Sequence, residues 1–171
     1  YKFLNNGSQF GEEKFILSFF NKSYKGKFVD IGCFHPTRHN NTYTMYKSGW
    51  NGINIDLNPL TIDLFNFARS KDININAAIS DNEENKALYF VDELNTQNTL
   101  EANHLSFLKN HHNLKEEEIS KQTIKTRRLD KILDSHNFND IDFMNIDVEG
   151  HELNILNSID FLKYNIKFIC I

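Results

Sequence analysis

The sequence has no long apolar run, few cysteines and no excess of positive charge. A membrane-spanning helix needs about 20 consecutive apolar residues, and no segment of this chain approaches that length. The net charge of −4 favours neither nucleic acid nor an anionic membrane surface as a partner. The two cysteines, Cys33 and Cys170, each lie in an apolar segment. A secreted disulfide scaffold would contain more, so we expect a reducing, cytoplasmic location.

The composition, with 40% hydrophobic and 25% charged residues, is ordinary for a globular protein. A length of 171 residues suits one domain with a substantial core, and we predict a single domain over residues 1–171. The chain ends inside an apolar run, residues 168–171. We therefore expect a strand there, with the closing strands of the sheet absent from this chain.

The stretch from Phe28 to Pro36, F-V-D-I-G-C-F-H-P, organises the rest of the chain. An apolar run that carries Asp30 is broken by Gly32, and Pro36 suits the first turn of a helix. This pattern is typical of a buried parallel strand that ends in a tight turn, where open α/β sheets hold their ligands. Asp30 is costly there unless it binds something, although it could also be a solvated acid at a strand end.

The turn after this strand lacks the G-x-G-x-x-G pattern that cradles a pyrophosphate. Its only glycine is Gly32, which would let a ligand approach the backbone closely, and Cys33, Phe34 and His35 follow it. One glycine and a leading acid suit a nucleoside with a cationic or amino-acid part and no phosphate. S-adenosylmethionine is the common ligand of this kind.

Downstream, strands and helices alternate, which predicts an α/β fold with a mostly parallel sheet and right-handed crossovers. We expect helices over residues 8–20, 37–48, 59–70, 129–136 and 153–158, and further strands over residues 52–56, 73–79, 86–91, 123–127 and 143–146. The apolar stripes predicted to face the core are Phe15, Ile16, Phe19 and Phe20 in the first helix and Leu60, Leu64, Phe67 and Ala68 in the third.

Asp56 ends the strand after the one that carries Asp30, roughly 25 residues further on, near the spacing at which nucleotide-binding α/β units place an acid on the ribose. A carboxylate can accept hydrogen bonds from both ribose hydroxyls. The segment Asn76 to Ala78 is small and polar at the next strand, where an adenine edge would fit.

Between residues 92 and 122 the pattern weakens. His104, His111 and His112 suggest a metal site. However, two of them are adjacent and no cysteine is near, so we expect no metal. We expect a lid or a substrate-facing insertion, or a plain solvated helix, over this segment.

Three acids crowd the segment I-D-F-M-N-I-D-V-E-G-H-E, residues 141–152. Asp147, Glu149 and Glu152 lie around a turn that also contains His151, and their mutual repulsion is costly unless they face a cation, a proton to transfer or donors from a substrate. Glu149 and Glu152 also suit the start of the next helix, where the helix dipole favours acids. Asp147 lies on the strand itself, where that explanation does not apply, so we expect it to have a functional role.

Taken in order, these motifs resemble those of the FkbM-type S-adenosylmethionine-dependent methyltransferases. The resemblance rests on D-I-G-C-F-H-P with N-N-T after it, G-W-N-G-I-N-I-D-L-N-P, N-A-A-I-S-D and N-I-D-V-E-G-H-E. The opening S-Q-F-G-E-E is similar to that family's S-Q-x-G-E-D. The likeness covers nearly the whole chain and implies a class I methyltransferase fold, Rossmann-like, with helices on both faces of the sheet.

The resemblance also implies roles for single residues. Asp30 and Gly32 would lie beside the methionine part of S-adenosylmethionine, Asp56 would hold the ribose, and Asp147 with Glu149 would sit where methyl donor and acceptor meet. The other residues expected to contact the cofactor are Gln9, Glu12, Cys33, Phe34, Asn41, Thr42, Leu57, Asn76, Ala77 and Ala78. The implied reaction is O-methylation, usually of a sugar or polyketide hydroxyl, with a surface-polysaccharide sugar as the default acceptor.

An alcohol is a poor nucleophile at neutral pH, so the reaction needs a base within reach of the hydroxyl. We expect His35, or Asp147 and Glu149 with His151 behind them, to serve. A divalent metal with Asp147 as one ligand is a variant of this chemistry. The alternatives are an NAD-dependent sugar oxidoreductase or epimerase and a non-catalytic cofactor-binding subunit.

Overall fold

The computed structural model of the protein describes residues 7–90, 100 and 119–171. The chain divides into two compact units. The first comprises Tyr1–Ala77, Asn137–Asp147 and Phe161–Ile171, and the second comprises Ala78–His136 and Val148–Asp160. Whether they fold as the predicted single domain stays a prediction. None of the described helices is long and apolar enough to cross a membrane.

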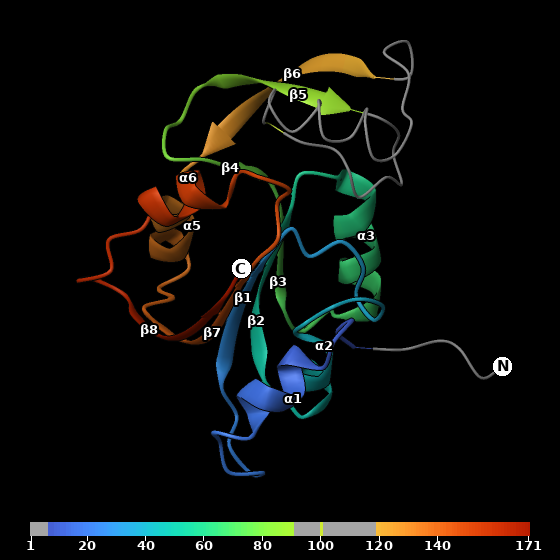
Figure 1. Cartoon of the computed structure of the whole chain (residues 1–171), viewed down its shortest axis with the longest axis vertical. Helices are drawn as coiled ribbons and strands as arrows, with labels where there is room; N and C mark the ends of the chain where they lie inside the picture. The colour runs from blue at the N-terminus through green and yellow to red at the C-terminus, as the bar shows by residue number, and fades with distance from the viewer. Residues whose placement is uncertain (1–6, 91–99, 101–118) are drawn as a thin grey trace, which may run out of the picture. The chain divides into compact units, whose positions relative to one another are not determined.

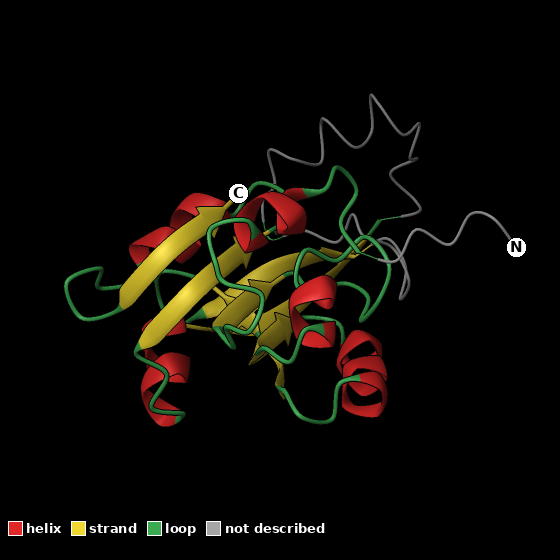
Figure 2. Ribbon diagram, turned by 90° about the horizontal axis from the view of Figure 1, so that it is seen from below, coloured by secondary structure: helices red, strands yellow, loops and turns green. Residues whose placement is uncertain are grey.

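The first unit contains a five-stranded, all-parallel sheet (Figure 1). Its strands lie in the order β3-β2-β1-β7-β8, and Figure 2 shows them side by side. Their bounds are β1 Lys27–Ile31, β2 Asn51–Asp56, β3 Ile73–Asn76, β7 Asp140–Ile146 and β8 Asn165–Cys170. The predicted α/β class with a parallel sheet is therefore confirmed, and the sheet is consistent with the predicted Rossmann-like fold.

Three helices belong to this unit: α1 (Glu12–Leu17), α2 (Tyr43–Lys47) and α3 (Pro59–Ala68). Pro59 starts α3, and the Asn58 side chain caps it by accepting a hydrogen bond from the Leu60 amide at 2.9 Å. The core joins α1 and α2 to the sheet through Ile16, Phe28, Met45, Trp50 and Phe143, all buried.

The predicted apolar face of α3 is wrong. Leu60, Leu64 and Phe67 are 42%, 46% and 91% exposed, whereas Ile62 and Phe65 are buried. The helix carries two apolar stripes. The one that includes Ile62 and Phe65 faces the core because it also brings Arg69, the residue after the helix, to the hydrogen-bond acceptors of the β1–α2 loop.

The predicted face of α1 is only half right. Ile16 is buried and Phe20 partly so, but Phe15 and Phe19 are 65% and 57% exposed. The inward face instead includes Glu13, which is 3% exposed because Ser8 and Thr44 both donate hydrogen bonds to it. The helix is also shorter than predicted.

The second unit contains a three-stranded sheet in the order β4-β6-β5, with β5 and β6 antiparallel. Its elements are β4 Ala78–Ile79, β5 Asn85–Phe90, β6 Ser120–Arg127, α5 Leu129–Ser135 and α6 Glu152–Asn157. The strand predicted over residues 73–79 is thus divided between β3 and β4. The predicted lid over residues 92–122 lies almost entirely outside the described residues, except where β6 begins.

Candidate functional site

A row of polar side chains crosses the parallel sheet near the carboxyl ends of its strands. The register pairs Asp30 with Asn54 on one side and with Asn145 on the other. The row continues outward to Asn74 on β3 and Cys170 on β8. We call these five residues the polar row. Since one register of a parallel sheet presents its side chains on one face, the row forms a continuous polar strip in a largely apolar sheet.

Asp30 is fully buried within this row. Its Oδ1 accepts a hydrogen bond from Asn145 Nδ2 at 3.0 Å, and its Oδ2 accepts from Asn40 Nδ2 at 2.9 Å and Thr42 Oγ1 at 2.8 Å. Three donors therefore offset the cost of burying this carboxylate. The protein itself supplies these donors, and contact between Asp30 and a cofactor stays a prediction.

The turn after β1 folds over the end of β2. The amides of Gly32 and Cys33 both donate to the carbonyl of Ile55, at 2.9 and 3.3 Å, and the Phe34 amide donates to Asp56 Oδ2 at 3.0 Å. Gly32 and Phe34 both have positive φ, 75° and 52°. Only glycine adopts this conformation freely, which explains why the turn begins with one.

Two residues of this turn differ in exposure. Cys33 is buried against Ile62 and Phe65, and burial raises the pKa of its thiol well above the usual range, with the charges of Asp56 and Asp30 adding to the effect. Phe34 is 36% exposed. Its ring is therefore the more accessible of the two predicted cofactor contacts.

In the described part of the chain, the Asp56 carboxylate is bound by two backbone amides. Its Oδ1 accepts from the Asn58 amide at 2.8 Å, and its Oδ2 from the Phe34 amide. Desolvation raises the pKa of Asp56 to about 6, and these two hydrogen bonds offset only part of the shift. Within the described parts of the chain no cation forms a salt bridge with it. The site thus contains an acid that ionises at an energetic cost.

The segment after β3 is joined to the end of β2. Asn76 Nδ2 donates to the carbonyls of Asp56 and Leu57 at 3.0 and 2.9 Å, and the Ala77 amide donates to the Asp56 carbonyl at 3.0 Å. Asn76 is exposed and Ala78 is buried. The structure therefore brings Asn76 and Ala77 beside Asp56, and their contact with adenine stays a prediction.

The start of α1 and the end of β8 reach the same side of the sheet. Burial raises the pKa of the Cys170 thiol, and the charges of Glu12, Asp147 and Asp30 raise it further, so these three acids lie around Cys170. Asn41 Nδ2 donates to Asn145 Oδ1 at 2.8 Å and approaches Cys170 Sγ at 4.0 Å. Predicted residues from four segments thus gather at the polar row.

Glu12 and Gln9 are the two predicted contacts from the S-Q-F-G-E-E opening. Glu12 Oε2 accepts from the Phe10 amide at 3.1 Å. Burial raises its pKa, but hydrogen bonds from its own amide and from neighbouring amides outweigh this effect, and the pKa is lowered. Gln9 is exposed, and its contact with a cofactor stays a prediction.

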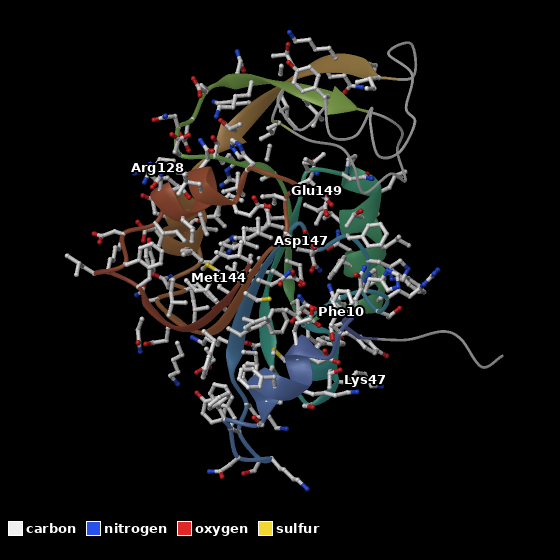
Figure 3. All side chains as sticks on the ribbon, in the orientation of Figure 1. Phe10, Lys47, Arg128, Met144, Asp147 and Glu149 are labelled. Carbon is white, nitrogen blue, oxygen red and sulfur yellow. The ribbon has the colours of Figure 1, made fainter. Side chains whose placement is uncertain are left out.

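Asp147 lies at the end of β7 (Figure 3) and is exposed. Its amide donates to the Ile31 carbonyl at 2.9 Å, which extends the pairing of β7 with β1 by one residue. This hydrogen bond fixes the backbone of Asp147 beside the start of the Gly32 turn. Asp147 therefore lies at the carboxyl end of the sheet, as predicted, and its role as a base stays a prediction.

Glu149, Glu152 and His151, which follow Asp147, differ in backbone conformation, hydrogen bonding and burial. Glu149 has a left-handed backbone, with φ 54°. Glu152 Oε1 accepts from the amides of Val148 and Gly150 at 3.3 and 3.1 Å, so it holds its own turn. His151 is 1% exposed, with Nε2 3.0 Å from Ser80 Oγ. These contacts favour a structural role for Glu152.

His35 has one ring nitrogen engaged. Its Nδ1 accepts hydrogen bonds from the amides of Thr37 and Arg38, both at 3.2 Å, which places the proton of the neutral ring on Nε2. Burial lowers the pKa of His35, and the positive charges of Arg38, Arg69 and His39 lower it further. In this geometry His35 is a hydrogen-bond donor through Nε2, and a role as base requires these bonds to break.

Sequence reasoning missed Asn40, Asn54, Arg69 and Asn145. A signal for two of them was present. Each polar-row residue is followed by isoleucine, in D-I, N-I, N-I, N-I and C-I. A polar residue at the same place in successive apolar strands indicates a strip across the sheet. Among the described residues no three His, Cys, Asp or Glu side chains are grouped to hold a metal, and His104, His111 and His112 lie outside them.

A five-stranded parallel sheet with a glycine turn at the carboxyl end of its first strand is typical of Rossmann-like α/β proteins. Comparison with protein families extends this assignment. The chain matches the methyltransferase FkbM domain over residues 9–171 and belongs to that family, which confirms the predicted resemblance. It is therefore a methyltransferase by family. No curated protein and no solved structure gave a significant match.

Proposed function

We propose that this protein transfers a methyl group from S-adenosylmethionine to a hydroxyl of a sugar or sugar-linked group, in the cytoplasmic biosynthesis of a surface polysaccharide such as a capsule or lipopolysaccharide. The observation that carries the proposal is Asp56. It ends β2 beside the Gly32 turn, bears the cost of desolvation and, among the described residues, accepts hydrogen bonds only from backbone amides. Two ribose hydroxyls would supply the donors that a partly desolvated carboxylate lacks.

The charges near Asp56 fit a cationic ligand. The carboxylates of Asp30 and Asp72 interact with the Arg69 guanidinium, which lies 4.0 Å from Asp72, whereas no described cation offsets the charge of Asp56. An excess of fixed negative charge in a low-dielectric region favours a positively charged ligand such as a sulfonium. The turn at Gly32 to Phe34 would hold the methionine part, and Asn76 with Ala77 would border the adenine.

When bound, S-adenosylmethionine would supply an electrophilic methyl group on a positively charged sulfur. The protein must then hold the acceptor hydroxyl in line with that group and remove its proton as charge develops on the oxygen. We assign proton removal to Asp147 or Glu149, because His35 Nδ1 already accepts two backbone hydrogen bonds. Asp147 suits this role because its carboxylate is exposed and its backbone is fixed by Ile31.

Isothermal titration calorimetry with S-adenosylmethionine, S-adenosylhomocysteine and NAD tests the proposal. We expect binding of the first two and none of NAD, with loss of affinity in Asp56→Asn. Binding of NAD alone would instead support the oxidoreductase or epimerase alternative. Turnover would then be measured with sugar and sugar-linked acceptors in the presence and absence of a chelator. Binding without turnover on any acceptor would support a non-catalytic subunit, and turnover lost to the chelator would indicate a metal.

A further inference from the structure

We propose that Arg69 is a positioning residue for the proposed cofactor site and acts through Asn40 and Thr42 on Asp30 and the Gly32 turn. The inference rests on the proposed function, because it concerns the geometry of the same site. Arg69 lies just after α3 and is 1% exposed. Its backbone amide donates to the Phe65 carbonyl within that helix, but all of the described hydrogen-bond acceptors of its guanidinium lie in other segments.

The guanidinium is bound to the β1–α2 loop through all three nitrogens. Nε donates to the Pro36 carbonyl at 2.9 Å, Nη1 to Thr42 Oγ1 at 2.8 Å and Nη2 to Asn40 Oδ1 at 2.7 Å. Its face packs on the rings of Phe65 and Tyr46, with Cζ 5.0 and 5.2 Å from their centroids. These contacts fix the plane of the guanidinium and, with it, the direction of each donor.

The direction of the Thr42 proton follows from counting lone pairs. Asn40 Oδ1 already accepts from Arg69 Nη2 and from the Thr42 amide, at 2.7 and 3.0 Å, so its two lone pairs are occupied. The Thr42 hydroxyl accepts from Arg69 and therefore gives its one proton to Asp30 Oδ2 at 2.8 Å. Arg69 thus sets the donor direction of Thr42 toward Asp30.

Asn40 carries the same orientation to the turn. With Oδ1 held by Arg69, its Nδ2 points two hydrogens elsewhere, one to Asp30 Oδ2 at 2.9 Å and one to the Cys33 carbonyl at 3.1 Å. One guanidinium therefore orients both of the side chains that donate to Asp30 Oδ2. Through Asn40 it also holds the Cys33 carbonyl, which belongs to the turn that we propose binds the methionine part. Stability alone does not require this arrangement, since an apolar side chain often replaces a buried charge without loss.

Two variants test the inference: Thr42→Val, which keeps the shape and removes the hydroxyl, and Arg69→Lys, which keeps the charge and removes the planar fork. We expect each to weaken binding of S-adenosylmethionine and S-adenosylhomocysteine by about tenfold or more, the value of a hydrogen bond to a charged group. The KM for the cofactor should rise similarly, while kcat at saturation changes less than about twofold. Thr42→Ser should restore both.

Asp142→Asn is the matched control, because Asp142 is another buried carboxylate of the same sheet with three donors, at the opposite ends of the strands. It should lower the melting temperature and leave cofactor affinity unchanged. If Thr42→Val and Arg69→Lys both keep wild-type affinity and KM, this inference is overturned while the proposed function stands. An equal loss of affinity in the Asp142→Asn control would have the same consequence. A wild-type protein that binds neither compound would overturn the proposed function and this inference with it.

Discussion

The two ends of the parallel sheet each hold a mostly buried acid, but they treat its charge differently. At the amino end, Asp142 accepts hydrogen bonds from the Lys27 amide at 2.8 Å, Tyr24 Oη at 2.9 Å and Lys167 Nζ at 2.5 Å. Burial raises its pKa, but these three donors outweigh burial and the pKa is lowered. At the carboxyl end, Asp56 has two backbone donors, and desolvation raises its pKa to about 6.

The difference separates an acid that stabilises the fold from one that suits a ligand. Lys167 neutralises Asp142, so the amino end needs no further partner. Asp56 remains costly to ionise, and acids with this property gather at functional sites because a bound ligand relieves the cost. The amino end of the sheet is also tightly packed. A Cβ added to Gly52, near the amino end, would lie 2.2 Å from the Phe28 carbonyl oxygen, so the strands meet closely there.

The largest effect is expected from Asp147→Asn at the carboxyl end. An amide cannot remove the acceptor's proton, and loss of a general base reduces turnover by about 10²–10⁴-fold. Affinity for S-adenosylhomocysteine should change little, because the Ile31 hydrogen bond uses the Asp147 backbone. Single-turnover assays and calorimetry on the same preparation would measure both quantities.

The control is Asp140→Asn, at the amino end of the same strand, where the acid is exposed and accepts from Asn165 Nδ2 at 3.2 Å. It should retain wild-type turnover. If Asp147→Asn also retains it, Asp147 has no part in the reaction, and Glu149→Gln becomes the variant to measure.

The second effect is on stability at the amino end. Gly52→Ala should destabilise the protein by about 1–3 kcal/mol, the usual cost of overpacking a filled core, because the added methyl meets the Phe28 backbone and ring. Urea denaturation would measure it. Asn51→Ala, an exposed neighbour on β2, should change the free energy of unfolding by less than about 0.5 kcal/mol. Equal stability of the two variants would show that β1 and β2 separate easily.

Sequence predicted the parallel sheet well because each strand is a short apolar run that ends in a turn signal. The pattern V-D-I-G before Pro36 and the pattern N-I-D before Asn58 and Pro59 each combine strand propensity with a residue that stops the strand. The positions of Asp56 and Asp147 at the carboxyl ends follow from those boundaries alone. Residues that depend only on where a strand ends are therefore within reach of the sequence.

The sequence did not predict which face of a helix is buried, because that depends on how the helix is rotated about its axis. In α3 the stripes of Leu64 and of Phe65 are both apolar, and only tertiary packing selects the second. Arg69 shows why. Its buried guanidinium needs acceptors from Asn40 and Thr42, and the sequence does not indicate that this loop lies against the end of α3. A buried charge set by contacts between distant segments carries no local signal.

The smallest effect, and the sharpest test of the contrast between the two ends, is in pH dependence. If Asp56 accepts from two hydroxyls, S-adenosylhomocysteine binds its ionised form. With a pKa of about 6, affinity should fall as the pH drops below 6, by at most about tenfold per unit, and stay level above it. Calorimetry between pH 5 and 8 would show this slope. Asp56→Asn should remove it, whereas Asp142→Asn should not.

Stability without ligand should respond in the opposite sense. The folded-state pKa of Asp56 lies above its ordinary value of 3.8, so between about pH 4 and 6 the folded state holds more protons than the unfolded state, and the Asp56 contribution to stability falls as the pH rises. The pKa of Asp142 is lowered, so the Asp142 contribution to stability is lost only as the pH falls below the ordinary value of 3.8. The pKa of Asp72 is also raised by burial, so part of the slope should survive in Asp56→Asn. A slope equal to that of the wild type would show that Asp56 does not contribute to it.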